Sequence, residues 1–109
     1  MTNKEFTNMY GTVARMQLKP GVEDRMMALG LEERARNIPG ALATFVYRMD
    51  NEPDVCYLAV VFESKEAYVA NADSPEQAAE YEKMRAMLAA DPEWHDGEVI
   101  LAWSPTPVV

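Results

Sequence analysis

The sequence predicts a single α+β domain, and three observations support that prediction. The chain has 109 residues, which is the length of one domain with one core. Its composition, 49% hydrophobic and 26% charged residues, is that of a globular protein and not of a disordered or fibrous one. Segments with the alternation of strands are interspersed with segments that carry helix start and stop signals. We expect residues 1–109 to form one domain, with its folded core over about residues 9–103.

The first half of the chain predicts a strand, a helix and a second strand. Residues 9–18 alternate between an apolar face, which includes Met16, and a mixed face. After a strand-breaking Lys-Pro-Gly, residues 22–37 are rich in helix formers, carry acidic residues near their start and are followed by Pro-Gly. Residues 41–49 alternate again, and the turn-rich segment 50–54 that follows them indicates a hairpin.

The second half predicts a buried strand, a helix broken in two and a last strand. Residues 55–62 are almost wholly apolar, as in a strand that is covered on both faces and lies centrally in its sheet. Ser64 can cap a short helix. Ser74 can cap a second helix, with proline at its first position and a reciprocal glutamine, that runs to about residue 89. The alternation of residues 98–103 predicts the last strand.

This order of elements is the split β-α-β pattern of a ferredoxin-like fold, an antiparallel sheet with its helices on one face. The other face needs cover as well, because the strand positions that alternate with the helix-facing ones are also apolar. A monomer of this size would expose a large apolar patch there, so we expect a face-to-face homodimer. The positions are Val13, Phe45 or Val46, Tyr57, Ala59, Val61, Leu101 and Trp103.

The charge and the single cysteine exclude several classes of function. With 10 basic and 18 acidic residues and no basic stripe, the chain would repel a nucleic acid backbone. No stretch approaches the roughly 18 consecutive apolar residues of a membrane span, and the amino terminus lacks the apolar core of a signal peptide. The lone Cys56 cannot form an internal disulfide, which is typical of a reducing compartment. We expect a cytoplasmic protein that binds neither nucleic acid nor membranes.

Few side chains offer metal or nucleophilic chemistry. One histidine, one cysteine and scattered carboxylates have no metal-ligand spacing, so we expect no bound metal. Cys56 lies in an apolar strand and is interpreted as a small buried hydrophobe. His95 could act as a general base oriented by Asp96, but neighbours on an extended chain point apart. A surface or interface histidine is the simpler interpretation.

Aromatic and arginine side chains are better candidates for a small-molecule site. Flat apolar walls with a few hydroxyl groups suit a planar aromatic substrate, although such residues also serve as ordinary core. Arg15 and Arg48, on half-buried strands, could each bind a phenolate or carboxylate, or pair with a glutamate across a dimer. The aromatic candidates are Tyr47, Tyr57, Tyr68, Tyr81, Trp94 and Trp103.

Several motifs resemble one family over nearly the whole chain, residues 9–103. They are RMQLKPG at 15–21, Pro39-Gly40, FESKEAY at 62–68, YVANADSP at 68–75, Tyr81 and PEWHDGE at 92–98. With the strand order, these motifs resemble the dimeric α/β-barrel superfamily, in particular its antibiotic-biosynthesis-monooxygenase-like group. The resemblance implies a homodimer that takes a small-molecule substrate. Because the group contains cofactor-free oxygenases of aromatic polyketides, haem-degrading oxygenases and small-molecule isomerases, it implies a class and not a substrate.

The residues at the family's functional positions match only in part. Members of the group often carry tryptophan after the third strand and histidine one turn into the next helix, where this chain has Glu63-Ser64 and Asn71. The missing histidine disfavours a haem-degrading enzyme, in which that side chain is the iron ligand. The amide of Asn71 can hydrogen-bond a carbonyl or a peroxide-like oxygen, which is compatible with a cofactor-free oxygenase.

The resemblance and the residues together predict an oxidoreductase, namely a cofactor-independent monooxygenase of a small aromatic or quinol-type molecule. The alternative is a non-catalytic small-ligand-binding or stress-related protein with the same fold. The candidate catalytic residues are Asn71, Tyr57, Tyr81 and Arg15, and the candidate substrate-binding residues are Tyr47, Tyr68, Trp103 and His95.

Overall fold

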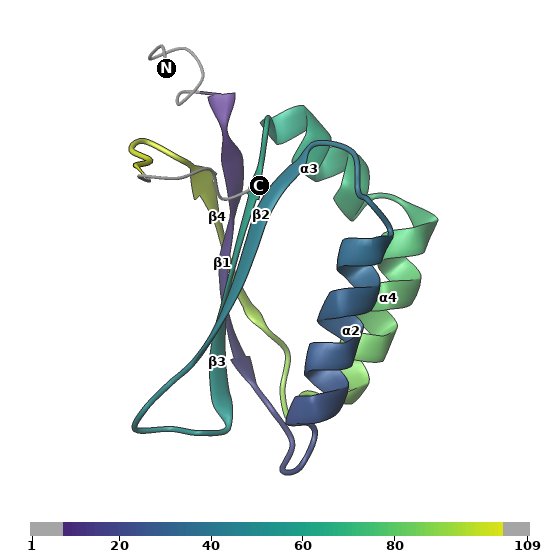
Figure 1. Cartoon of the computed structure of the whole chain (residues 1–109), viewed down its shortest axis with the longest axis vertical. Helices are drawn as coiled ribbons and strands as arrows, with labels where there is room; N and C mark the ends of the chain where they lie inside the picture. The colour runs from purple at the N-terminus through teal and green to yellow at the C-terminus, as the bar shows by residue number, and fades with distance from the viewer. Residues whose placement is uncertain (1–7, 104–109) are drawn as a thin grey trace.

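A four-stranded antiparallel sheet forms one layer of the domain, and the helices form a second layer on one face of it (Figure 1). The computed structural model describes residues 8–103. In chain order the elements are β1 (Tyr10–Gln17), α2 (Glu23–Ala35), β2 (Ala41–Arg48), β3 (Val55–Phe62), α3 (Lys65–Ala72), α4 (Pro75–Ala86) and β4 (Glu93–Glu98). The predicted ferredoxin-like α+β fold is confirmed.

The strand order β2-β3-β1-β4 places β3 and β1 at the centre of the sheet. The nearly continuous apolar sequence of β3 predicts this position, because a central strand of a covered sheet is buried on both faces. Antiparallel pairing of β1 with β3 places Ala14 opposite Leu58 and Met16 opposite Cys56. Opposed residues share a face of the sheet, and these four side chains lie on the face that the helices cover.

The second face of the sheet carries no helix among the described residues (Figure 1). Ala59 of β3 lies on this open face and is paired with Val13 on one side and Phe45 on the other. Val13 is 49% exposed and Phe45 is 43% exposed. The sequence left open whether Phe45 or Val46 faces away from the helices. Phe45 does so, since Val46 is paired with Leu58 on the helix-covered face.

The last strand is not where the apolar alternation places it, and the prediction of a strand over 98–103 is wrong. The strand that closes the sheet is Glu93–Glu98, which pairs with β1 along its whole length. Directly after α4 the amide of Ala89 donates to the carbonyl of Gln17, which returns the chain to the edge of β1. The pairing positions of β1 are therefore filled before the alternating segment begins.

Residues 99–103 consequently lie beyond the edge of the sheet. The amide of Val99 donates to the carbonyl of Met9, and no further strand pairing follows among the described residues. Ile100 is 91% exposed, Leu101 is 82% exposed and Trp103 is 85% exposed. Leu101 and Trp103 therefore do not extend the apolar face of the sheet to which the sequence assigned them, because a side chain takes a sheet face only where its backbone is paired.

The apolar core fills one end of the space between sheet and helices, near the start of α2 and the end of α4. Cys56 is part of it, as predicted, and burial raises the pKa of its thiol. Among residues 8–103, no helix has the length and apolar character that crossing a bilayer requires. The buried core residues are Met16, Leu18, Val22, Met26, Leu29, Cys56, Met87 and Leu88, with Leu58 and Met84 partly buried against them.

Candidate functional site

The inward stripe of α2 changes from apolar to charged along the helix. Val22, Met26 and Leu29 are buried. One and two turns further on, the half-buried residues are Glu33 and Arg36, the latter capping the end of α2. Because these five residues recur at three- and four-residue spacing, they lie on one side of the helix. The polar end of that side lies at the opposite end of the domain from the core.

The inward stripe of α4 changes in the same way. Met87 is buried and Met84 partly buried at the end of the helix, whereas Glu80 is buried and Gln77 half-buried toward its start. The two helices lie side by side and run in opposite directions (Figure 1). Their polar ends therefore meet, next to the carboxyl end of α3.

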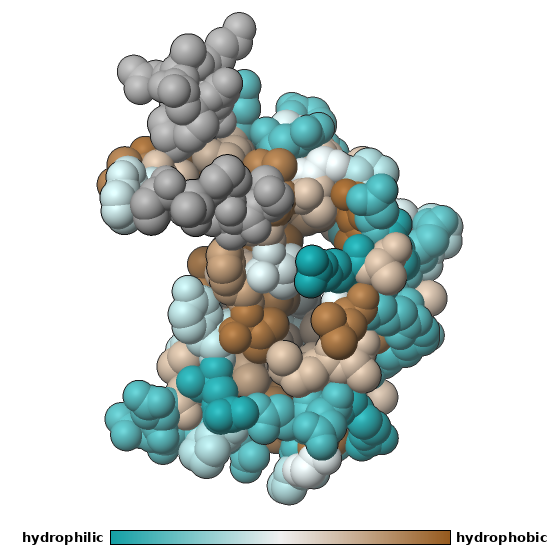
Figure 2. All heavy atoms as spheres, in the orientation of Figure 1, coloured by the Kyte–Doolittle hydropathy of each residue, from teal (hydrophilic) through white to brown (hydrophobic). Residues whose placement is uncertain are grey.

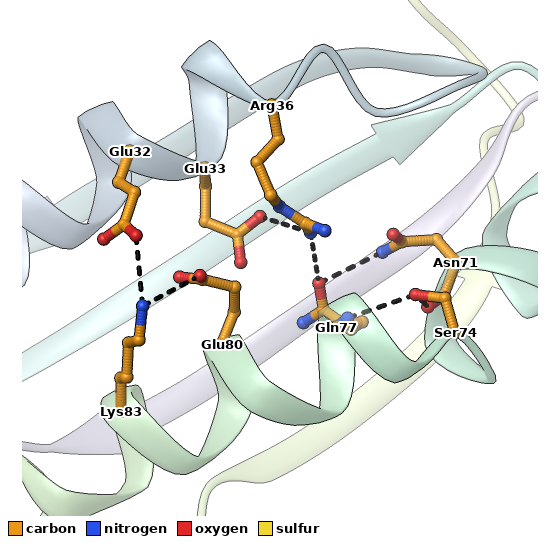
Figure 3. Close-up of polar contacts among 8 residues, drawn as sticks. All are labelled: Glu32, Glu33, Arg36, Asn71, Ser74, Gln77, Glu80 and Lys83. Atoms are coloured by element: carbon orange, nitrogen blue, oxygen red, sulfur yellow. Dashed lines mark hydrogen bonds and ion pairs between the residues drawn. The ribbon is translucent and has the colours of Figure 1, made fainter.

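Five side chains from three helical segments meet at this point: Glu33, Arg36, Asn71, Gln77 and Glu80, which we call the interhelix cluster (Figure 3). The Arg36 Nη2 atom donates to Glu33 Oε2 at 2.9 Å and to Gln77 Oε1 at 3.2 Å. The Asn71 Nδ2 atom donates to the same Gln77 oxygen at 3.4 Å. One amide oxygen thus connects the end of α2 with α3 and α4.

Lys83 borders the interhelix cluster on its outer side (Figure 3). Its Nζ atom donates to Glu32 Oε1 at 3.0 Å and to Glu80 Oε1 at 3.2 Å. The hydrogen bonds to Glu32 and then to Glu80 raise the pKa of Lys83 above its ordinary value. The ammonium group therefore stays charged and compensates one oxygen of the Glu80 carboxylate.

The second carboxylate oxygen of Glu80 has no hydrogen-bond partner among the described residues, although the residue is only 7% exposed. A buried carboxylate destabilises a fold unless its oxygens are hydrogen-bonded or paired with charge. The Nε atom of Arg36 is also buried without a partner in the described part of the chain. Buried polar groups are nearly always hydrogen-bonded in folded proteins, so these two atoms are exceptions that need an explanation.

The space next to this cluster is open to solvent between β2 and α2. Helix-facing residues of a central strand are normally buried, and Cys56 and Phe62 of β3 are only 5% and 2% exposed. Leu58 and Val60, which lie between them on the same face, are only half-buried. Val46 of β2, also on this face, is 44% exposed. Figure 2 shows the molecule hollowed here between sheet and helices, and we call this hollow the interlayer cleft.

The break between α3 and α4 brings Asn71 to Gln77. The Ser64 and Ser74 hydroxyls accept the backbone N–H of the third residue after each and so cap the two helices, as the sequence predicts. The Ser74 hydroxyl also donates to the Asn71 carbonyl at 2.7 Å and ties the end of α3 to the start of α4. In one continuous helix, residues six apart would lie about 9 Å apart along the axis and on different sides. The break therefore creates this contact.

Aromatic residues line the edge of the helix-covered face near β4. The Tyr68 hydroxyl donates to Asp96 Oδ1 at 2.9 Å, and burial followed by this hydrogen bond raises the pKa of Tyr68 to about 12. The ring of Tyr81 lies 6.3 Å from that of Trp94, measured between centroids. Both tyrosines belong to the helical layer and contact side chains of β4.

The predicted site residues are divided between the two faces of the sheet. Asn71, Tyr81 and Tyr68 lie on the helix-covered face, and Asn71 belongs to the interhelix cluster. Trp103 lies beyond β4 and is 85% exposed. The remaining four lie on the open face. His95 is paired with Val13 on this face, and Tyr57, two residues before Ala59 on β3, is paired with Arg15 and Tyr47. The four are Arg15, Tyr47, Tyr57 and His95.

The open-face residues form contacts of their own. Tyr47 is paired with Tyr57, and Arg15 lies 3.7 Å from Glu52 and 3.8 Å from Glu93, measured between nitrogen and carboxylate oxygen. His95 is within β4 and points away from Asp96, which binds Tyr68 on the other face. Asp96 therefore does not orient His95.

The sequence reasoning missed four members of the interhelix cluster as functional candidates: Glu33, Arg36, Gln77 and Glu80. Glu80 and Lys83 have the spacing of an ordinary surface ion pair on a helix, so the sequence pattern alone predicts an exposed pair and not a buried carboxylate. A usable signal was present, because Glu80 lies one turn before Met84 and interrupts the apolar stripe of α4.

In residues 8–103, no three side chains of His, Cys, Asp or Glu are grouped so that they could hold a metal ion. Two surface depressions of about 430 Å³ lie outside the cleft, one along α3 and one between α2 and α4. The second is lined by Arg25, Glu32 and Lys83 among others. Charged side chains such as these are typical of a solvated surface, so the interlayer cleft remains the candidate site.

Solved structures with the same fold come from bacteria and archaea. One is the crystal structure of a protein from Chloroflexus aurantiacus that is described as an antibiotic biosynthesis monooxygenase. It is 29% identical to this chain, covers 88% of this chain and 97% of its own, and has a TM-score of 0.71. A conserved protein from Methanosarcina mazei has a TM-score of 0.76 at 16% identity, covering 89% of this chain and 98% of its own. At 16% identity the second likeness shows the fold alone.

A third neighbour is an asparagine-to-alanine mutant of SnoaB, a cofactor-independent oxygenase from Streptomyces nogalater. It is 13% identical over 87% of this chain and 96% of its own, with a TM-score of 0.75. A comparison with curated protein sequences gives no match. The sequence pattern of the antibiotic biosynthesis monooxygenases matches residues 9–83. Because this match spans more than half of the chain, the protein belongs to the antibiotic biosynthesis monooxygenase family.

Proposed function

We propose that this protein is a cofactor-independent oxygenase that binds a small aromatic or quinol-type molecule in the interlayer cleft. The observation that supports the proposal is the interhelix cluster, in which the Asn71 amide and the Arg36 guanidinium converge on Gln77 at the polar end of the helical layer. Small-molecule sites combine apolar walls with a few converging polar groups. The family and the SnoaB neighbour support the reaction class.

The proposed reaction uses the substrate as the source of electrons. A substrate that loses two hydrogen atoms and gains one oxygen atom from O₂, with the second oxygen atom leaving as water, balances without another reductant. Asn71 donates a hydrogen bond to the oxygen that develops negative charge on the substrate or on the peroxide. Leu58 and Val60 form the apolar floor, and Tyr81 lies at the far edge of the same layer.

Oxygen uptake with a panel of hydroquinones tests this function. We expect Asn71→Ala to lower the rate at saturating substrate by about 10- to 100-fold, because a hydrogen bond to developing charge is lost. Asn51→Ala, in the exposed turn between β2 and β3, is the matched control and should leave the rate unchanged. An equal rate in Asn71→Ala, or no uptake with any hydroquinone, contradicts the proposal. The second outcome favours a ligand-binding protein without chemistry.

Tyr57 and Arg15 test the location of the site. The sequence proposed both as catalytic residues, but both lie on the open face, on the other side of the sheet from the interhelix cluster. We propose that the site uses Asn71 and Tyr81 and that Tyr57→Phe keeps the full rate of oxygen uptake. A drop in Tyr57→Phe similar to that in Asn71→Ala would place the chemistry on the open face.

We propose in addition that the open face is covered by a second copy of the chain. Val13, Phe45 and Tyr47 are each between 43% and 57% exposed on this face, and soluble monomers rarely expose a patch of this kind. Native mass spectrometry should give twice the mass of the 12.3 kDa chain. Phe45→Glu should shift it to the single mass, since a charge cannot be buried there unpaired. A wild-type monomer contradicts this proposal.

A further inference from the structure

Residues 99–103 form an apolar segment after β4 that neither the fold nor the proposed reaction has used, and we call it the apolar arm. Ile100 is 91% exposed, Leu101 is 82% exposed and Trp103 is 85% exposed. The arm contains no charged residue, in a chain in which 26% of the residues are charged. Soluble proteins commonly expose single apolar side chains, but a contiguous exposed run is typical of a surface that binds a partner.

The arm leaves the sheet on the side of the open face. Figure 1 shows this segment, in yellow, on the side of the sheet that points away from the helices. The amide of Val99 donates to the carbonyl of Met9, so contact with the sheet continues to this residue. His95 of β4 is paired with Val13 on the open face, and Val99 follows it at an even spacing along the chain. The arm therefore begins at the border of the open face.

The arm does not cover the open face of its own chain. Val13 and Phe45 remain 49% and 43% exposed. To reach them, the chain would have to reverse directly after Val99, and residues 98–103 contain no glycine or proline, which tight reversals favour. The apolar alternation of the arm is typical of an extended chain instead. Five extended residues span about 17 Å, which exceeds the roughly 10 Å between two sheets that pack face to face.

We propose that the apolar arm of each chain packs on the open face of a second copy, so that the two copies of the homodimer exchange arms. The inference rests on the proposed function only in that it takes a second copy as the cover of the open face. A two-fold axis makes such an interface self-complementary, so each copy provides one arm and receives one. It gives Trp103 a role in assembly instead of substrate binding.

Charge and area favour a second copy as the partner of the arm. Each chain has a formal net charge of -8, and an uncharged contact surface avoids repulsion between two acidic copies. A stable interface buries about 800 Å² on each partner, and one tryptophan side chain can bury about 150–250 Å². The arm therefore adds substantially to the area of the open face, whose apolar side chains are already half-covered by their neighbours in the sheet.

The fluorescence of Trp103 tests the exchange. A Trp94→Phe background leaves Trp103 as the single tryptophan, because the chain has 2. The dimer should emit at short wavelength and resist quenching by acrylamide, since the indole ring is covered. Phe45→Glu in the same background should give a monomer whose Trp103 emits at longer wavelength and is quenched several-fold more strongly. Dilution of the Trp94→Phe dimer until it dissociates should give the same change without a charge in the sheet.

Leu101→Glu tests how much the arm contributes to assembly. This substitution should raise the dissociation constant of the dimer by about tenfold or more, measured by analytical ultracentrifugation, because it buries a charge without a partner. Leu31→Glu is the matched control, since Leu31 is 66% exposed on α2 in the helical layer, and it should leave the dissociation constant unchanged. Equal dissociation constants for Leu101→Glu and wild type overturn the inference.

The outcomes separate the arm from the dimer. A dimer in which Trp103 is as easily quenched as in the monomer overturns the exchange and leaves the second copy in place. Equal protection of Trp103 in monomer and dimer also overturns it, because the arm then packs on its own chain. A wild-type monomer overturns both the exchange and the cover of the open face by a second copy. Oxygen uptake tests the oxygenase function separately from all of these.

Discussion

The two ends of the space between sheet and helices are built from the same helices and differ in every property that matters for function. At one end Met16, Leu18 and Leu88 are at most 4% exposed and belong to the apolar core cluster. At the other end Glu33, Arg36 and Gln77 are half-buried and hydrogen-bonded, beside a cleft that reaches solvent. The apolar end stabilises the fold, and the polar end holds groups that do not stabilise it.

This separation indicates where selection for stability and selection for chemistry act on the chain. A buried group with unused hydrogen-bonding capacity is retained against its effect on stability only where it has another role. Among the described residues, two of the three such groups, on Arg36 and Glu80, lie at one end of α2 and α4, and the third is the hydroxyl of Thr12 in β1. The following predictions test that separation, beginning with the largest expected effect.

Met16→Ala tests the apolar end. Met16 is 1% exposed, and its truncation should lower the free energy of unfolding by about 2–5 kcal/mol, measured by urea denaturation. Met27→Ala is the matched control, because Met27 is 55% exposed on α2, and should change the free energy by no more than about 0.5 kcal/mol. Equal losses in the two variants would show that the apolar end does not dominate stability.

Thiol labelling compares solvent access at the two ends along a single strand. Cys56 is 5% exposed at the apolar end, and burial raises the pKa of its thiol, so the native protein should react slowly with iodoacetamide. A Val60→Cys variant in a Cys56→Ala background should react about a hundredfold faster or more. Position 60 is only half-buried, so the reagent can reach the thiol without local unfolding of the protein. Similar labelling rates would mean that both ends are equally closed.

Glu80→Met tests the polar end, where we expect an apolar substitution to raise the free energy of unfolding. Replacing the buried carboxylate by an apolar side chain of similar length should raise the free energy of unfolding by about 1–3 kcal/mol. Glu82→Met on the exposed side of α4 should leave the free energy within about 0.5 kcal/mol. If Glu80→Met is less stable than wild type, the cluster is a structural network and not a site.

Tyr68→Phe has the smallest effect at neutral pH. Loss of the hydrogen bond to Asp96 should lower the free energy of unfolding by about 0.5–1.5 kcal/mol. The pKa of Tyr68 is raised from 10.0 to about 12 in the folded protein, so the folded state holds this proton more tightly than the unfolded chain. The stability it contributes is complete below pH 10 and is lost as the pH rises through about 12.

The pH dependence of Tyr68→Phe gives a sharper readout than its effect at neutral pH. Wild type should lose stability between the unfolded and the folded pKa of Tyr68, and the variant should lack that component of the loss. Parallel curves of unfolding free energy against pH for the two proteins would contradict the assignment of the raised pKa to Tyr68.

Most of the fold was predictable because its signals are local. Ser64 and Ser74 each precede a helix with the spacing of a cap, and the apolar run of β3 marks a central strand. The last strand was not predictable from alternation, because its position depends on where α4 returns the chain to β1. Residues 98–103 have the better strand pattern, but residues 93–98 reach the vacant edge first.

Only one member of the interhelix cluster was predicted as a site residue. Asn71 was identified from the resemblance, because it occupies the position where members of the family often carry a histidine, and the structure places it in the interhelix cluster. Glu80 interrupts the apolar stripe of α4, but its burial also depends on how closely α2 packs against α4, and the sequence of α4 does not specify that distance. Arg15 and Tyr57 share a face of the sheet, but the sequence does not say which face is the cleft.

At the joint Asp73-Ser74, the number of residues between α3 and α4 decides which side chains come together in the site, as well as which residue types the helices carry. Asn71 and Gln77 meet only because α3 ends and α4 begins anew between them. One residue inserted at this joint would turn α4 by about 100° relative to α3, and would present a different set of side chains to the cleft. Insertions and deletions at a single position could therefore diversify ligand preference among relatives while leaving the sheet and its core unchanged.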